Sequence, residues 1–495
     1  MAAKGGISFF ASVVTLCKTI IGAGLLALPF AQAQTGLLLG VVLLVAMAIV
    51  TAFVLHLFAV CVVNARAPGR DPPSFFSLAI DAGLSPVLIE SCVALATFGF
   101  ATSYLVVMAD LAPEIVSSLA GGHDQLPSYV GGAGAGADEA RYFWISVLGG
   151  AVGLPLMMLR QLDMLKFSSV IGNIGIIYVV VVTTLIALGV LPDGGEDGGS
   201  GSGSLVLPQE GAAAPAPAAA PAVAVCRSWS GCAKLGFPGN VPDALSVLSI
   251  YVFAFACTQS IPPIMAEMQG ATLPRVNGVI AVSLFFCTSV FAICGIAGYY
   301  TYGSTVNADL LKCFPKNAVS TVARVGILLS VTGSYPIFMY IVRKSVCKMV
   351  YGLEPNALPF HKFLIVTLSI FGPSYTIAMV VKNLDTILGF VGSTVGMLVG
   401  FTIPGFIFTC LESKQRQLMS LQGSLQGSLQ GSLLANSPGG RRSAAASAVG
   451  STARDPVLLP QPQWKVCVAM VVTWGSAVLI PVLVGVQVYS MVQSK

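Results

Sequence analysis

Charged residues are scarce in this sequence. Only 9% of its 495 residues are Asp, Glu, Lys or Arg, whereas a soluble domain carries about 25%. The twelve cysteines stand singly, without CxxC pairs or Cys/His clusters, so neither a zinc site nor a redox motif is indicated, and no metal or cofactor is expected. The basic residues are dispersed and form no patch with aromatic residues, so nucleic acid is not an expected partner. The loops lack a nucleophile–base pair and a phosphate loop, so an enzyme is not expected.

Apolar residues, in contrast, are abundant. They make up 55% of the chain and give a mean hydropathy of +0.86. Because a bilayer-spanning helix needs about 20 mostly apolar residues, this composition predicts an all-α membrane protein in a lipid bilayer. Runs of that length predict eleven transmembrane helices, at about 7–34, 36–63, 86–119, 142–159, 168–191, 243–266, 276–302, 319–342, 361–381, 384–411 and 464–492.

The Lys and Arg residues between these spans predict the orientation of the chain. Sixteen of them lie in segments that share a side with the N-terminus, and eight lie on the opposite side. Since cytoplasmic segments carry the excess of basic residues, we expect the N-terminus in the cytoplasm and the C-terminus on the far side.

Two long segments of low complexity divide the chain. Residues 193–240 contain runs of Gly, Ser, Ala and Pro, and residues 412–463 contain a Ser-Leu-Gln-Gly repeat from Ser420. Such compositions cannot bury enough apolar surface to fold. We therefore expect a non-cytoplasmic loop that is disordered up to about Val225, and a cytoplasmic disordered loop. The predicted divisions are 1–192 with spans 1 to 5, 193–240, 241–411 with spans 6 to 10, 412–463, and 464–495 with span 11.

Three cysteines fall on the same predicted side of the membrane, namely Cys226, Cys232 and Cys313. One disulfide among these three is compatible with that placement, and free thiols are the alternative. The sequence favours neither.

The first span carries a cation. Lys18 lies near its centre, at a cost of about 2.5 to 3.5 kcal/mol on insertion scales, and such a group is tolerated where it faces a polar interior or a partner. The span is expected to break just after it, at Ile20 to Gly24, since two glycines one residue apart favour non-helical backbone. The sixth span is expected to break near Ala256 to Ser260, ahead of Pro262 and Pro263.

Five spans separate the first interrupted helix from the second, which predicts a five-plus-five inverted repeat with the eleventh span as an addition. Many secondary transporters bind their substrate between paired breaks of this kind. Unpaired amides and carbonyls at the half-helix ends can hold a carboxylate and an ammonium, as in an amino acid. A packing seam is the alternative reading of the glycines. The predicted substrate-binding residues are Thr19, Ile20, Ile21, Gly22, Ala23, Gly24, Phe255, Ala256, Cys257, Thr258 and Gln259.

Two residues outside the breaks are further candidates. Tyr104, on the third span, can donate its hydroxyl proton to a carboxylate, and a packing tyrosine is the alternative. Glu267 follows the broken sixth helix, and we predict that it pairs with a basic residue as a cytoplasmic gate.

Ordered motifs are spread along the chain: Lys18-Thr-Ile-Ile-Gly-Ala-Gly-Leu-Leu-Ala-Leu-Pro29, Ser103-Tyr-Leu-Val-Val-Met-Ala-Asp110-Leu-Ala-Pro113, Pro155-Leu-Met-Met-Leu-Arg-Gln-Leu-Asp-Met-Leu-Lys-Phe-Ser168, Gly298-Tyr-Tyr-Thr-Tyr-Gly303, and Val331-Thr-Gly-Ser-Tyr-Pro336 with Arg343. Together they resemble the amino acid/auxin permease family, which includes vacuolar-type, sodium-coupled neutral and proton-coupled amino acid transporters. The resemblance covers nearly the whole chain apart from the two low-complexity segments. It implies a leucine-transporter type of fold and ion-coupled amino acid transport.

The sequence departs from this family pattern at the ion site. The resemblance implies an asparagine in the sodium-coupled branch where this chain has Lys18, with a hydroxyl on the eighth helix completing the site, here Thr332 or Ser334. An ammonium cannot coordinate a cation, and the proton-coupled branch resembles this chain in having lysine. We therefore expect sodium-independent transport, with a structural, permanently charged Lys18 as the alternative to a titrating one. Many relatives have a histidine in the sixth break, where this chain has Thr258, Gln259 and Ser260.

The expected function is secondary active transport of amino acids by alternating access, driven by protons or by exchange. An amino acid sensor that uses the same pocket, with residues 412–463 as its output, is the alternative. We expect a monomer in a vacuolar or lysosomal-type membrane or in the plasma membrane, and the sequence indicates neither the particular amino acid nor the direction of transport.

Overall fold

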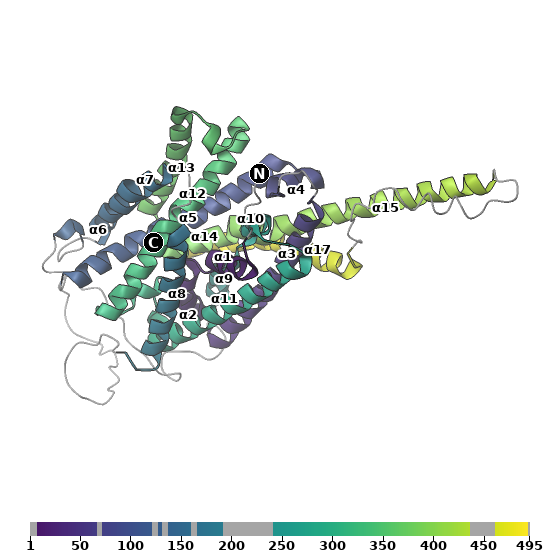
Figure 1. The fold of residues 1–495 in the computed structure, drawn as a ribbon. Helices are drawn as coiled ribbons and strands as arrows, with labels where there is room; N and C mark the ends of the chain where they lie inside the picture. Colours follow the sequence, from purple (N-terminus) through teal and green to yellow (C-terminus); the bar gives the residue numbers. More distant parts are fainter. Residues whose placement is uncertain are drawn as a thin grey trace.

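The computed structural model describes residues 7–66, 72–120, 127–130, 137–159, 166–191, 241–435 and 461–493. Within these residues the fold is helical (Figure 1), and the one extended pairing is an isolated bridge between Ile7 and Met268. The longer helices are α1 (Phe9–Ile20), α2 (Gly24–Thr35), α3 (Leu37–Asn64), α4 (Phe75–Ala82), α5 (Pro86–Leu119), α6 (Ala137–Trp144), α8 (Lys166–Ala187), α9 (Val241–Phe255), α11 (Leu273–Tyr302), α12 (Ala318–Tyr351), α13 (Phe360–Val380), α14 (Leu384–Val391), α15 (Ile403–Ala435) and α17 (Gln463–Gln493).

Short helical segments join some of these helices. The π-helical η3 (Ile145–Gly153) and α7 (Leu154–Met157) extend α6, and the 3-10 helix η5 (Thr258–Ser260) leads into α10 (Ile261–Glu267). The π-helical segments η9 (Gly392–Gly396) and η10 (Leu398–Thr402) connect α14 to α15. A further 3-10 turn, η7 (Leu310–Lys312), lies between α11 and α12.

The described helices match the prediction of a multi-pass membrane protein. Nine of them are long and apolar enough to cross a membrane, or ten if α1 and α2, which meet at a bend of 54°, count as one span. The fifth predicted span corresponds to α8, whose described apolar part, Gly172–Ala187, is shorter. The helical fold class is thus confirmed, while the count of eleven spans and the inverted repeat stay predictions.

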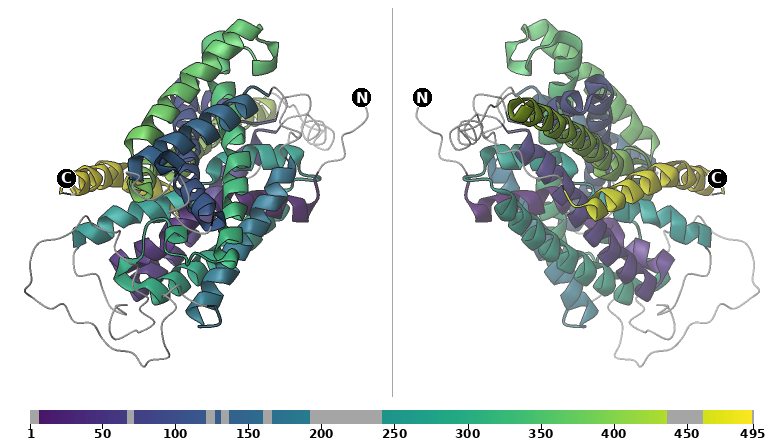
Figure 2. Two further views of the ribbon diagram at one scale, coloured as in Figure 1. Left: turned by 90° about the vertical axis from the view of Figure 1, so that its left-hand side faces the viewer. Right: turned by 90° about the vertical axis from the view of Figure 1, so that its right-hand side faces the viewer.

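Helix α5 lies at the centre of the bundle. In the most apolar stretch of α5, 83% is buried, because small residues allow close approach of the neighbouring helices α12, α13 and α14. At Gly99, for example, an added Cβ would lie 2.7 Å from Cγ2 of Val391. Helix α17 is the opposite case, since it lies along the outside of the bundle (Figure 2) and only 22% of its most apolar stretch is buried. Its exposed Val471, Trp474 and Val478 are suited to contact with lipid.

The first part of the low-complexity segment 412–463 is helical, and the disordered cytoplasmic loop stays a prediction for the remainder. Helix α15 continues as far as Ala435 and projects beyond the bundle (Figure 1). Three of every four residues in its Ser-Leu-Gln-Gly repeat, namely Ser, Leu and Gln, are compatible with helical backbone. Residues 436–460 lie outside the described part of the chain.

Two other expectations fall partly or wholly outside the described residues. The segment 193–240 does so entirely, and it includes Cys226 and Cys232. Their predicted neighbour Cys313 is a buried free thiol, whose Sγ accepts a hydrogen bond from the main-chain N–H of Asn307 (3.2 Å). No disulfide to Cys313 is therefore formed in this structure.

Candidate functional site

The first span is interrupted between α1 and α2, at the position predicted from its glycines. After Ile20, the backbone of Ile21 is non-helical (φ −83°, ψ 88°), and Gly22 donates its main-chain N–H to the carbonyl of Ile20 (3.0 Å). Within the described residues, the main-chain N–H groups of Ala23 and Gly24 have no recorded acceptor. They stand at the start of α2, where the helix dipole adds partial positive charge. This end of the break is suited to an anionic group.

The sixth span is interrupted after α9, again at the predicted position. Ala256 and Cys257 are non-helical, and Cys257 has φ −122° and ψ 7°. Thr258 Oγ1 donates to the carbonyl of Gly400 on η10 (2.8 Å), which fixes the break against the tenth predicted span. Pro262 occupies the first turn of α10, where a missing N–H leaves no helical bond unmade.

The two breaks face a common cavity of about 20 Å³, here called the break cavity. Gln259 supplies its main polar side chain, and Nε2 donates to the carbonyl of Ala256 (3.4 Å). Gln259 Oε1 is buried and has no hydrogen-bond partner among the described residues, so it is an acceptor open to a donor such as an ammonium. The predicted residues that line this cavity are Thr19, Ile20, Gly22, Ala23, Gly24, Tyr104, Ala256 and Gln259.

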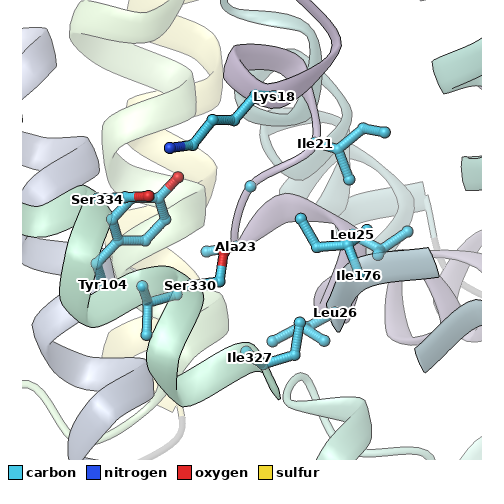
Figure 3. A pocket seen from close by; sticks show the side chains of 12 residues that line it. Lys18, Ile21, Ala23, Leu25, Leu26, Tyr104, Ile176, Ile327, Ser330 and Ser334 are labelled. Carbon is cyan, nitrogen blue, oxygen red and sulfur yellow. The ribbon is translucent and has the colours of Figure 1, made fainter. Parts of the chain in front are cut away.

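A second cavity of about 20 Å³ lies beside the first break, and we call it the Lys18 cavity. The side chains of Lys18, Tyr104 and Ser334 point toward one another there, with Ser330 one turn below Ser334 on α12 (Figure 3). Gly22 and Ala23 line both cavities, as does Tyr104. The half-buried ammonium of Lys18 therefore lies among hydroxyl groups at the edge of the break.

The glycines of the first break are required by close approach. An added Cβ at Gly22 would lie 2.7 Å from the hydroxyl oxygen of Tyr104, and one at Gly24 would lie 3.0 Å from Cα of Ala254 on α9. Neither glycine has a positive φ. Because these glycines have no side chains, the unwound backbone can approach Tyr104 and the sixth span closely. Close packing therefore explains the two glycines, whereas the sequence suggested backbone freedom.

Aromatic rings close the other side of the break cavity. The ring centroids of Phe100 and Phe253 are 4.9 Å apart, and those of Tyr104 and Phe338 are 5.4 Å apart, both in edge-to-face arrangements. The residues that line the break cavity include no carboxylate, Lys or Arg. This wall is suited to an uncharged side chain.

Both cavities are small in this conformation. A cavity of about 20 Å³ has room for an ordered water molecule and is too small for an amino acid. An amino acid, the predicted substrate, would therefore need a wider cavity than this conformation offers.

Some predicted residues lie away from both cavities. Thr332 Oγ1 donates to Sδ of Met108 (3.2 Å), because it is two residues from Ser330 and Ser334 and faces another side of α12. Phe255 packs edge-to-face against Phe291. Cys257 is fully buried and Thr258 is held by η10, so neither lines a cavity in this conformation.

Sequence reasoning missed residues that the fold brings into the site. Ser330 could have been found, since it is four residues before Ser334 and shares its helix face. Phe100, Phe253 and Phe338 gave no such signal, because their contribution depends on how three spans pack together.

The end of the bundle near Ile7 and Glu267, which is expected to face the cytoplasm, is closed by main-chain bonds. Ile7 donates its N–H to the carbonyl of Glu267 (2.8 Å), and Gln269 donates its N–H to the carbonyl of Ile7 (3.1 Å). The guanidinium of Arg66 donates to the carbonyl of Met265. Glu267 has an exposed side chain, and its carboxylate forms no ion pair within the described chain. The predicted gate pair therefore stays a prediction.

The apolar helices and the two facing breaks define a multi-pass helical membrane protein of the transporter class. A family model described as transmembrane amino acid transporter protein matches residues 5–198 and 223–419. The chain therefore belongs to this family of amino acid transporters, and the resemblance found in the sequence is confirmed.

Similar proteins include both vacuolar and sodium-coupled transporters. Vacuolar amino acid transporter 5 of Schizosaccharomyces pombe is 28% identical over 416 residues, which cover 83% of this chain and 86% of the relative. Vacuolar amino acid transporter 6 of Saccharomyces cerevisiae is 23% identical over 80% of this chain and 89% of the relative. Sodium-coupled neutral amino acid symporter 2 of Danio rerio is 21% identical over 83% and 77%.

Proposed function

We propose that this chain is a secondary active transporter that moves amino acids by alternating access, without sodium. The observation that carries the proposal is the break cavity, where the start of α2 and the end of α9 meet around an unpartnered acceptor. Family membership supports amino acids as the substrate class. The relatives named as vacuolar support a vacuolar-type membrane, with the plasma membrane as the second option.

The proposed binding mode uses the two breaks for the two charges of an amino acid. The N–H groups of Ala23 and Gly24 receive the carboxylate, with the Tyr104 hydroxyl as a third donor. Gln259 Oε1 and the carbonyls at the end of α9 receive the ammonium. The aromatic wall suits a substrate whose side chain is uncharged. The other residues predicted at the breaks contact the substrate in an opened conformation.

The proposed role of Lys18 is to occupy the place of a sodium ion. Its ammonium points toward Ser334 and Tyr104 and adds a positive charge beside the break. A second cation in the same place is repelled. Protons or exchange then drive transport. The proposed transporter is a monomer with eleven spans and a cytoplasmic N-terminus. Glu267 acts as a gate only in conformations other than this one.

The test is uptake of radiolabelled amino acids by the full chain in proteoliposomes with imposed sodium or proton gradients. Wild type is expected to take up a neutral amino acid without sodium, and Lys18→Asn to lose most of that uptake. Lys344→Asn is the matched control, since Lys344 is 49% exposed in a surface pair with Glu354. A sodium requirement in wild type contradicts the proposal, and binding without uptake indicates the sensor alternative.

A further inference from the structure

A cluster of buried charges closes the end of the bundle opposite the Ile7–Met268 bridge. Asp110 on α5 forms ion pairs with Arg141 on α6 and, at 2.9 Å, with Lys312 on η7. The side chains of Asp110 and Arg141 are 5% and 7% exposed. Arg141 also donates to the carbonyls of Ala378 (3.3 Å) and Val381 (2.9 Å) at the end of α13. This cluster therefore ties α5, α6 and α13 to the segment between α11 and α12.

That segment, residues 306–314, is held down by a buried arginine. Arg324 on α12 is fully buried and donates to the carbonyls of Leu311 (3.2 Å) and Phe314 (2.7 Å), with a longer bond to Pro315 (3.5 Å). The turn η7 packs against α2, α5 and α12. Since α2 is the second half of the broken first span, residues 306–314 cover the α2 end of the path proposed above.

Asp309 is the acidic residue of this segment, and only one of its two carboxylate oxygens is hydrogen-bonded within the described residues. It is fully buried; Oδ1 accepts the N–H of Leu311 (3.1 Å), and Oδ2 has no hydrogen-bond partner among the described residues. The neighbouring cations have other partners: Lys312 and Arg141 pair with Asp110, and Arg324 binds carbonyls. An ionised carboxylate with one bare, buried oxygen is costly, and the protonated form costs less because it carries no charge.

The surroundings of Asp309 raise its affinity for a proton. Burial, together with the nearby Asp110 on α5, raises the pKa of Asp309 to about 6. Lys312 opposes this shift, and the Leu311 hydrogen bond and Arg324 on α12 oppose it more weakly. Helix α2, the third element packed on this segment, has no titratable residue. Glu114 on α5 and Tyr302 on α11 act on Arg324, and Asp385 on α14 interacts with Lys312. The buried Cys313 thiol is a further titratable group beside Asp309, and Asp309 contributes to raising the pKa of that thiol.

We propose that Asp309 is a proton-binding site on the non-cytoplasmic side, and that its proton holds residues 306–314 closed over the α2 end of the path. The assignment of sides and of the path rests on the proposed function. The proton passes from water on that side to Oδ2 and returns to the same water when the segment opens. It therefore controls when the end opens and is not itself carried across the membrane.

The sign of the pH dependence follows from linkage. In the open state Asp309 is hydrated and has an ordinary pKa near 4, so the closed state binds its proton more tightly. Acid therefore stabilises the closed state, and this stabilisation is lost as the pH rises through about 6. Between pH 5 and pH 7 the ratio of closed to open states falls about tenfold.

The test is hydrogen exchange with mass spectrometry on the full chain in detergent, expressed as protection factors so that the intrinsic pH dependence cancels. We expect protection of residues 306–314 to fall about tenfold from pH 5 to pH 7, while residues 265–270 in the same molecule stay unchanged. Asp309→Asn is expected to remove the pH dependence, and Glu139→Gln, an exposed acid on the same predicted side, to keep it.

Constant protection of 306–314 in wild type overturns the proposal, even if Asp309→Asn does not fold, and so does a pH dependence that survives in Asp309→Asn. This measurement needs no transport, so it can fail or succeed independently of the uptake experiment. In proteoliposomes, the same variant is expected to flatten the dependence of uptake rate on non-cytoplasmic pH.

Discussion

The two ends of the proposed path are closed by different interactions. At the Ile7–Met268 end, closure uses main-chain hydrogen bonds and an arginine bound to a carbonyl. At the opposite end it uses buried ion pairs centred on Asp110, with Asp309 beside them. Main-chain bonds between neutral groups do not depend on pH and contribute about 1 kcal/mol each. Buried charges are sensitive to pH and to loss of one partner.

This difference indicates which end can sense its surroundings. A gate of neutral main-chain bonds opens when neighbouring helices move, whatever the pH. A gate of buried carboxylates responds to the proton concentration on its own side. In a membrane with an acidic compartment on that side, the second gate is the one suited to report it.

The largest effect is expected from Asp110→Asn. The substitution leaves the buried Arg141 and the partly exposed Lys312 without a counter-charge, so the free energy of unfolding should fall by about 3 kcal/mol. The measurement is SDS titration of the purified full chain, followed by circular dichroism.

Two variants serve as references for Asp110→Asn. Glu354→Gln breaks the exposed pair with Lys344 and should cost less than about 1 kcal/mol. Adding Arg141→Met to Asp110→Asn removes an uncompensated cation and should recover part of the loss. If Asp110→Asn costs no more than Glu354→Gln, the two ends do not differ as described.

A smaller effect is expected at the centre of the path, from Gly22→Ala. The new Cβ would lie 2.7 Å from the Tyr104 hydroxyl oxygen, and overpacking of this kind costs about 1 to 3 kcal/mol. Because the change lies between the two ends, hydrogen-exchange protection should fall at both 265–270 and 306–314. In a Tyr104→Phe background, which lacks the oxygen, the loss of unfolding free energy should shrink; an unchanged loss would contradict the packing explanation.

Much of the fold could be predicted from the sequence, since a bilayer requires long apolar helices and these are visible in one dimension. The breaks were also visible, because Gly22, Gly24 and Pro262 are local signals. Contacts between distant segments were not. The position of the Phe338 side chain and the ion pairs of Asp110 depend on which helix faces meet. Thr332 was predicted in place of Ser330 because the sequence does not show which face of α12 points inward.

At the main-chain gate, Ile7→Pro is expected to have a modest effect. Proline removes the N–H that donates to the carbonyl of Glu267, which costs about 1 kcal/mol. Protection of residues 265–270 should therefore fall about fivefold at every pH, while 306–314 stays unchanged. Ile7→Val keeps the N–H and is the control. A pH-dependent loss at 265–270 would mean that this end also contains a titrating group.

The smallest effect is expected from Glu267→Gln. Its carboxylate is exposed and forms no ion pair in the described closed state, whereas its carbonyl, which the substitution keeps, accepts the Ile7 N–H. Unfolding free energy should change by less than about 0.5 kcal/mol, and protection of 265–270 should not change. A loss of protection would show that the side chain closes this end after all. Reduced uptake with unchanged protection would instead assign the predicted gate pair to an open conformation. Main-chain bonds would then close this end, and buried charges would close the other.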